Sequence, residues 1–197
     1  MSSVSVNHGP DQTPLRLRRI TADEYFQMVR EGIIREGERV ELIGGMIVSM
    51  SPAERRHNGA LFRLTEGLRR IDGAGLAVQL TLTLDDDTVV DPDLALLRPA
   101  TEPEAGLTPA DVLLLVEVAD TSLPTDRGAK AERYARAGIT DYWIVDVEAR
   151  RVLVLREPGE TGYTSVTEIG LEGEARALHV ADAVVRVADL FPGVTNT

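Results

Sequence analysis

Apolar and polar residues along the chain follow helical and strand spacings in turn, and these spacings predict an interleaved order of elements. Thr21 and Glu24 form a capping-box pattern ahead of a short amphipathic helix that is expected to end near Gly32. Residues 39–50 contain two apolar runs around a Gly-Gly pair, a pattern typical of a β-hairpin. The N-terminal part is therefore expected to be a helix followed by a hairpin.

The middle of the chain predicts a second helix and two long strands. Ser51-Pro52-Ala53-Glu54 combines a Ser cap, an early proline and a glutamate, and predicts a helix of about five turns to roughly Ile71. Residues 76–84 alternate in the β manner, an Asp-Asp-Asp turn follows, and residues 89–97 are expected to form the return strand.

The second half adds strands around one more helix. Residues 99–111 are expected to be a loop, residues 112–118 a strand buried on both faces, and residues 125–137 a helix ending at Gly138. Further strands are expected at 142–147, 152–155, 163–169 and 175–187. This order predicts an α/β or α+β fold, one mixed β-sheet flanked by helices, in a single domain over 15–197 that follows a flexible tail at 1–14.

Composition narrows the functional classes. The chain of 197 residues is 43% hydrophobic and 27% charged, which is typical of a folded soluble protein. The absence of cysteine excludes disulfides, thiolate metal sites and a cysteine nucleophile. The longest apolar run, Val112–Val116, is far shorter than the ~20 residues of a membrane span, and no targeting signal is visible, so we expect a cytoplasmic protein.

The charge is strongly acidic, and the cations are almost all arginine. There are 32 acidic and 21 basic residues, a net charge of −11, and Lys130 is the only lysine. This balance argues against a broad surface that coats nucleic acid, because such binding requires many neutralised phosphates, but it allows a small cationic groove.

Three acids interrupt apolar strands. Glu117 ends the most hydrophobic run, Asp93 follows Pro92 at the head of a strand, and Glu41 lies in the first strand of the hairpin. A lone buried carboxylate costs several kcal/mol, roughly, unless it is paired, protonated or bound to a metal. A structural ion pair would explain Glu41 or Glu117, and a turn cap would explain Asp93. If the acids converge instead, Mg²⁺ or Mn²⁺ is the natural counter-ion, and such a site suits phosphodiester hydrolysis.

The lysine lies on the helix that follows the Glu117 strand. Asp126, Lys130 and Tyr134 are spaced i, i+4, i+8, so they share one helical face. An exposed Asp126–Lys130 ion pair worth about 0.3–0.5 kcal/mol is one explanation. The other is that lysine is required here as a compact cation near the attacking water or the phosphate.

These residues resemble a known signature. Pro92-Asp93 followed by Glu117-Val118 resembles the PD-(D/E)XK nuclease motif, with Ala119 in the place of the signature lysine. The chain is more closely similar to the Uma-two-type restriction endonucleases of that superfamily. The matching segments are 40–45, 50–52 with His57, 92–94, 117–122, 126–130, 134–135, 137–139 and 141–146. The resemblance covers about residues 17–192.

The resemblance implies a restriction-endonuclease-like core and a set of roles. Asp93, Glu117 and the Val118 carbonyl would bind the metal, with Glu41 at its edge through water. Lys130, which in this family is thought to replace the strand lysine, would act on the attacking water or the phosphate. His57, Asp126, Tyr134 and Arg127 would support the site or contact substrate, although His57 is equally explained as a satisfied helix histidine.

Two functions remain open at this point. The first is a Mg²⁺- or Mn²⁺-dependent endonuclease acting on nucleic acid, with DNA expected and phosphate contacts from arginines at 55, 56, 63, 69, 70, 127 and 133. The second is a catalytically silent nuclease-fold module that binds a protein or nucleic acid or associates with itself. A homodimer is compatible with either function.

Overall fold

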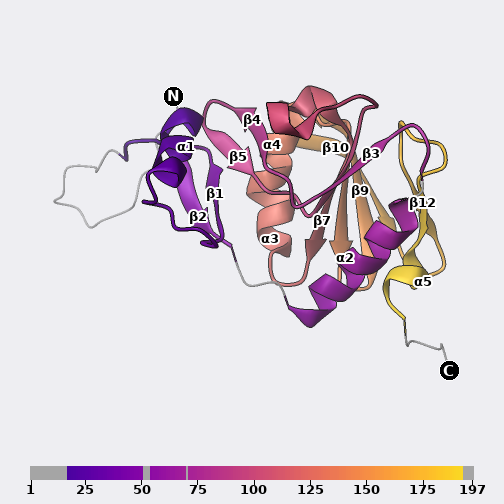
Figure 1. Cartoon of the computed structure of the whole chain (residues 1–197). Coiled ribbons are helices and arrows are strands. Elements are labelled where there is room, and N and C mark those ends of the chain that lie inside the picture. Colours follow the sequence, from indigo (N-terminus) through magenta and orange to yellow (C-terminus); the bar gives the residue numbers. More distant parts are fainter. Residues whose placement is uncertain (1–16, 51–53, 70, 193–197) are drawn as a thin grey trace.

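The protein is described by a computed structural model over residues 17–50, 54–69 and 71–192. Within these residues the main body is a six-stranded sheet in the order β10-β9-β8-β7-β6-β3 (Figure 1). Its strands are β3 (Gly75–Val78), β6 (Leu94–Leu97), β7 (Val112–Ala119), β8 (Asp141–Asp146), β9 (Arg151–Gly159) and β10 (Gly162–Ile169). Neighbours are antiparallel except β7 and β8, so the sheet is mixed as expected.

A smaller sheet precedes it in the chain, in the order β2-β1-β5-β4. It contains β1 (Val40–Ile43), β2 (Met46–Ser49), β4 (Leu82–Asp85) and β5 (Thr88–Val90), and helix α1 (Ala22–Arg30) packs against it. The predicted capping box of Thr21 and Glu24 is present, and the predicted hairpin turns at Gly44 and Gly45, whose φ angles are 58° and 75°. Both local predictions are confirmed.

The expectation of a single sheet is wrong, because a two-stranded sheet at 174–176 and 184–186 also forms, besides the large and the small sheet. Each of the long strands predicted at 76–84 and 89–97 divides between the sheets. The first breaks at Gln79, whose φ is 50°, and the second breaks at Asp91-Pro92-Asp93, where proline offers no N–H for a ladder. The connection from β5 to β6 therefore carries the chain from the small sheet into the large one, and Asp93 lies at that crossing.

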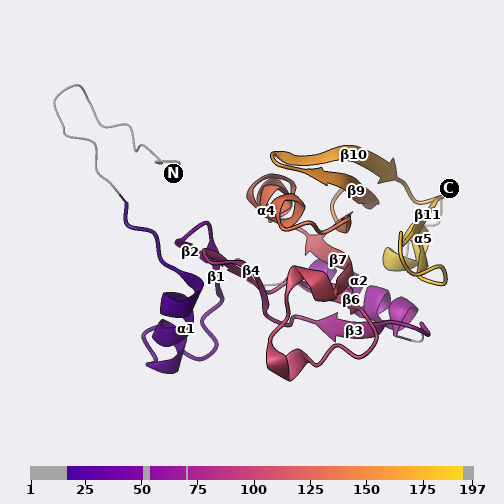
Figure 2. The same cartoon turned by 90° about the horizontal axis from the view of Figure 1, so that it is seen from above.

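Helices cover both faces of the large sheet (Figure 2). One face carries α2 (Arg55–Leu68) and the C-terminal segment of β11 (Glu174–Arg176), β12 (Val184–Arg186) and α5 (Val187–Leu190). The other carries the continuous helical segment α3 (Leu123–Thr125), η3 (Asp126–Lys130) and α4 (Ala131–Arg136). Side chains of β7 alternate between the two cores, because Val116 and Val118 join the first while Leu115 and Ala119 join the second.

The other sequence predictions concern strand β7, the 99–111 connection, the N-terminal tail, the cap of α2 and the domain boundary. Strand β7 is buried throughout, as predicted, and the 99–111 connection contains two 3₁₀ turns, η1 (Pro103–Ala105) and η2 (Pro109–Asp111). The predicted tail at 1–14 and the Ser51 cap of α2 lie outside the described residues. The assignment of 15–197 to a single domain stays a prediction. No helix among the described residues is long and apolar enough to cross a membrane.

Candidate active site

Glu117 lies in the centre of the large sheet and faces the helical segment that follows its strand. Its neighbours on that face of β7, Leu115 and Ala119, pack with α4, so the alternation of the strand directs Glu117 toward the same helix. Tyr134 of α4 donates its hydroxyl to Glu117 Oε1 at 2.7 Å, and Lys130 Nζ donates to the same oxygen at 3.0 Å. Glu117 is thus a buried carboxylate held by two donors.

Lys130 lies at the end of a π-helical turn and joins acids from both sheets. It is 1% exposed and donates to Glu41 Oε1 at 2.9 Å as well as to Glu117. Asp126, Lys130 and Tyr134 share one buried face, as predicted, and π-helical turns occur frequently at functional sites. Lys130 does not form the exposed pair with Asp126; the Asp126 carboxylate instead accepts the Ser122 hydroxyl at 2.5 Å.

Asp93 meets Glu117 because the sheet register requires it. Leu94 pairs with Val116 across β6 and β7, so one further step places Asp93 beside Glu117. Asp93 Oδ2 accepts the Val118 N–H at 2.8 Å and lies 3.0 Å from His57 Nε2 of α2. The other oxygen of Asp93 accepts no hydrogen bond from the described residues.

Glu41 reaches this cluster from the small sheet. Its Oε1 accepts the Asp91 N–H at 2.9 Å in addition to Lys130, while Oε2 is buried and has no hydrogen-bond partner among the described residues. A buried carboxylate oxygen without a partner is costly, which indicates that this site is not built for stability alone.

Asp93, Glu117 and Lys130 line a cavity of about 60 Å³, which we call the carboxylate cavity. Acids outnumber cations along its wall: Glu54, Asp91, Asp93, Glu117, Asp120 and Asp126 are opposed by Arg39, Lys130 and the imidazole of His57. An excess of negative charge in a partly enclosed space attracts a cation.

Asp120 is the main lining residue to which sequence reasoning assigned no role. Its side chain is 6% exposed, Oδ1 accepts Arg56 at 2.7 Å, and Oδ2 has no partner in the described part of the chain. The available signal was its position directly after the end of β7, one residue beyond the Glu117-Val118-Ala119 segment.

Burial and neighbouring charges shift several pKa values in the cluster. Burial raises the pKa of Glu117 to about 8, although the charge of Lys130 opposes that shift. Burial alone would lower the pKa of Lys130, but Glu117 and Glu41 outweigh it and raise that pKa, so the lysine stays charged. Burial also disfavours protonated His57, yet its contact with Asp93 produces a net rise in the pKa of the imidazole.

The residues present fit a metal ion held by two carboxylates rather than by a preformed cage. No group of three or more His, Cys, Asp or Glu side chains in the described ranges is placed to hold a metal together. Asp93 and Glu117 each keep one oxygen free of hydrogen bonds from these residues and line the same cavity. Mg²⁺ is commonly bound through one or two carboxylates, with water and substrate phosphate completing its shell.

The predicted arginine contacts are mostly not brought to the cavity. Arg127 is exposed and is not part of the cavity wall. Arg133 pairs with Asp87 at 3.3 Å, and Arg69 pairs with Glu66 at 3.2 Å. Arg70 lies outside the described residues, and Arg55, Arg56 and Arg63 line a different cavity.

Comparisons with known proteins agree on a nuclease-type family and fold. Residues 22–188 match the family model Uma2, described as "putative restriction endonuclease". A solved structure from Anabaena variabilis, described as a "putative nuclease belonging to DUF820", is similar with a TM-score of 0.63 at 17% identity, covering 87% of this chain and 97% of that one. At this identity the likeness establishes the fold. A comparison with curated proteins finds no match.

Proposed function

Since the chain belongs to the Uma2 restriction endonuclease family, we propose that it is an endonuclease that hydrolyses phosphodiester bonds of DNA with Mg²⁺ or Mn²⁺. One observation carries the proposal. Glu41 of the small sheet and Glu117 of the large sheet both bind the single lysine of the chain, and this lysine lines the carboxylate cavity together with Glu117 and Asp93.

The proposed metal ligands are Asp93 and Glu117, with the Val118 carbonyl beside them and Glu41 at the edge through water. When bound, such an ion activates water and stabilises charge on the phosphoryl oxygens. The contact of His57 with Asp93 orients that carboxylate, and the hydroxyl of Tyr134 orients Glu117.

Lys130 is the proposed catalytic cation. An ammonium group has three N–H donors, and two of them are directed at Glu41 and Glu117. The third donor remains for the attacking water or for a phosphate oxygen. The charges of Glu117 and Glu41 raise the pKa of Lys130 and so keep it charged. These contacts also hold the almost completely enclosed side chain in place.

The direct test is cleavage of a panel of DNA and RNA substrates with Mg²⁺, Mn²⁺ or EDTA. We expect divalent-dependent cleavage that is lost in Asp93→Asn and in Lys130→Arg, since arginine cannot reproduce the compact ammonium group. Asp86→Asn, an exposed acid-to-amide change in the β4–β5 turn, is the matched control and should keep activity. Inactivity of the wild-type protein on the whole panel with both metals would contradict the proposal.

A second candidate is a silent nuclease-fold module that binds a partner or another copy of itself. The observation in its favour is the net charge of −11, which opposes tight binding of nucleic acid. Calorimetry separates the two. If the wild-type protein binds Mg²⁺ or Mn²⁺ no better than an Asp93→Asn, Glu117→Gln variant, the silent module is favoured.

A further inference from the structure

A second cavity, of about 300 Å³, lies between the start of α2, the turn joining β8 to β9, and the chain just beyond α5. Four arginines line it: Arg55, Arg56, Arg63 and Arg150. The rest of its wall is small or apolar and includes Val147, Leu190 and Phe191. We call this cavity the arginine groove.

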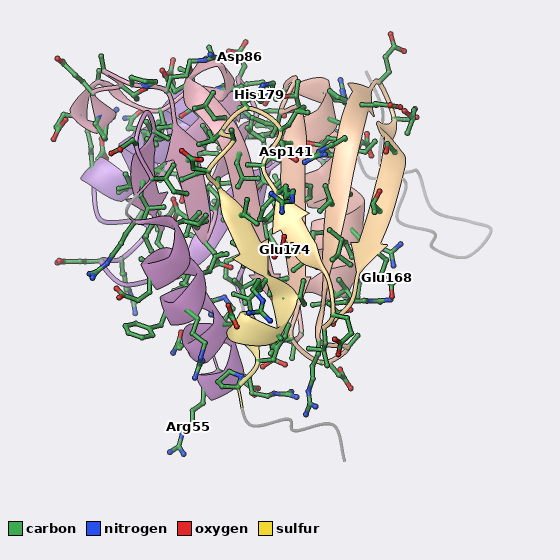
Figure 3. All side chains as sticks on the ribbon, turned by 90° about the vertical axis from the view of Figure 1, so that its right-hand side faces the viewer. Arg55, Asp86, Asp141, Glu168, Glu174 and His179 are labelled. Atoms are coloured by element: carbon green, nitrogen blue, oxygen red, sulfur yellow. The ribbon has the colours of Figure 1, made fainter. Side chains whose placement is uncertain are left out.

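The groove is cationic in a protein that is strongly acidic overall. No acid among the described residues lines it, and the side chains of Arg55 and Arg150 make no hydrogen bond or ion pair with the described part of the chain. Figure 3 shows Arg55 extending from the N-terminal end of α2 into solvent. The first turn of α2 carries no acid, and its N-cap residue, Glu54, makes no side-chain cap hydrogen bond. Arginines at the positive end of a helix dipole are unfavourable unless an anion joins them.

Helix α2 connects the groove to the carboxylate cavity. Arg56 lines the groove and pairs at 2.7 Å with Asp120, which lines the cavity, and the adjacent His57 contacts Asp93. From His57 to Arg63 the helix advances about 9 Å at 1.5 Å per residue. Along the axis of duplex DNA that length corresponds to two to three nucleotide steps of one strand, at a rise of about 3.4 Å each.

We propose that the arginine groove holds the nucleic-acid strand next to the phosphodiester bound in the carboxylate cavity. Arg55 and Arg150 contact backbone phosphates, and one base packs against Phe191. An arginine-lined wall beside an aromatic ring is the combination that binds a strand without reading its sequence. The inference rests on the proposed function for the identity of the substrate, but it is tested by binding rather than by cleavage.

The test measures binding of fluorescently labelled single-stranded and duplex oligonucleotides by anisotropy, in EDTA so that no cleavage occurs. The variant is Arg55→Ala, Arg150→Asn. Neither arginine has a partner to lose, and asparagine tolerates the φ of 54° at position 150. The control is Arg136→Ala, Arg176→Ala, which removes two exposed arginines and changes the net charge equally.

We expect the groove variant to bind about tenfold more weakly, with the slope of log K against log salt reduced by about two, and the control to bind like the wild-type protein. Phe191→Leu keeps an apolar side chain and should weaken binding without changing the salt slope, because it removes stacking rather than a phosphate contact. A 5′-mononucleotide in the same assay should bind far more weakly than the oligonucleotide.

Three results would overturn the inference: no oligonucleotide binding by the wild-type protein, equal binding by the groove and control variants, or a mononucleotide that binds as tightly as the oligonucleotide. The last would indicate a nucleotide site rather than a strand path. Because cleavage is scored separately, a protein that binds through the groove and does not cleave supports the groove and contradicts the proposed nuclease. A protein that cleaves DNA although its groove variant binds like the control supports the proposed nuclease and contradicts the groove.

Discussion

Lys130 is the residue on which the buried polar cluster depends. It is 1% exposed and is the cationic partner of Glu41 and Glu117, which are also buried. Removing one partner of a buried ion pair costs more than the pair contributes, because the opposite charges stay buried without compensation.

We expect Lys130→Met to lower the free energy of unfolding by about 3–5 kcal/mol, measured by urea denaturation with circular dichroism. Arg136→Met is the control. It removes an exposed cation from α4 whose pair with Glu132, at 3.8 Å, is worth about 0.5 kcal/mol at most. A loss below about 1 kcal/mol in Lys130→Met would show that Glu41 and Glu117 adapt without the lysine.

Asp126 makes stability depend on pH. Burial raises its pKa to about 6 from an ordinary value of 3.8, against the opposing effects of Lys130 and Ser122. Because the folded pKa is raised, the favourable contribution is present below the unfolded value and is lost as the pH rises through the folded one. The wild-type protein should therefore lose stability at this position between about pH 4 and 6.

Asp126→Asn should not show this loss, because asparagine does not titrate and its side-chain oxygen can still accept the Ser122 hydroxyl. Unfolding free energies of both proteins from pH 4 to 8 should diverge in favour of the variant, by up to about 3 kcal/mol for a two-unit shift. A difference that stays constant over this range would mean that Asp126 is not the titrating group.

At the scale of elements, two glycines differ in whether alanine can replace them without strain. Gly128 lies in the π-helical turn η3, has no atom within 4 Å of an added Cβ and has no positive φ. Gly44 has a φ of 58° in the β1–β2 turn, and an added Cβ would meet the guanidinium of Arg133.

Gly128→Ala should raise the unfolding free energy by about 0.5–1 kcal/mol, because alanine restricts the unfolded chain. Gly44→Ala should lower it by about 1–2 kcal/mol, because left-handed backbone is unfavourable for alanine. Thermal melts of both variants measure the pair. Destabilisation by Gly128→Ala would indicate that the π-helical turn needs glycine to form.

At the scale of the whole molecule, the C-terminal segment brings distant parts of the chain together. Its residues Leu190 and Phe191 line the arginine groove with residues of α2 and of the β8–β9 turn. Asp141 of β8 accepts the Leu178 N–H at 2.6 Å, Arg156 Nε at 2.9 Å and Trp143 Nε1 at 3.1 Å. Thr140 and His179 add a contact at 2.7 Å, and Figure 3 shows Asp141 and His179 where this segment crosses the sheet. These contacts help to fasten the segment that carries Leu190 and Phe191 to the sheet.

Binding of a divalent cation is a second feature that concerns the whole molecule. If a divalent ion binds the carboxylate cavity, it stabilises the folded chain relative to the unfolded one. We expect Mg²⁺ or Mn²⁺ at ten times its dissociation constant to add about 1.4 kcal/mol to the unfolding free energy, seen as a rise in Tm. The rise should disappear in Asp93→Asn, Glu117→Gln and persist in Asp86→Asn. An equal rise in all three proteins would place the ion elsewhere.

The sequence by itself determined several local elements and singled out the acids and the lysine that form the buried polar cluster. The cap at Thr21, the Gly-Gly hairpin and the buried β7 strand follow from short-range rules. The acids within apolar strands could be recognised because burying a carboxylate is costly wherever it occurs. Lys130 could be recognised because it is the only lysine in the sequence.

Only the tertiary structure decided how these parts meet. The breaks at Gln79 and at Asp91-Pro92-Asp93 send two apparently continuous strands into different sheets, a division set by packing rather than by periodicity. The partners of Lys130 proved to be Glu117 and Glu41, the latter 89 positions away, instead of Asp126 on its own helix. The arginine groove likewise joins α2, the β8–β9 turn and the C-terminal segment. Contacts between residues so distant in the chain depend on the register of sheets and the packing of helices, which no local pattern encodes.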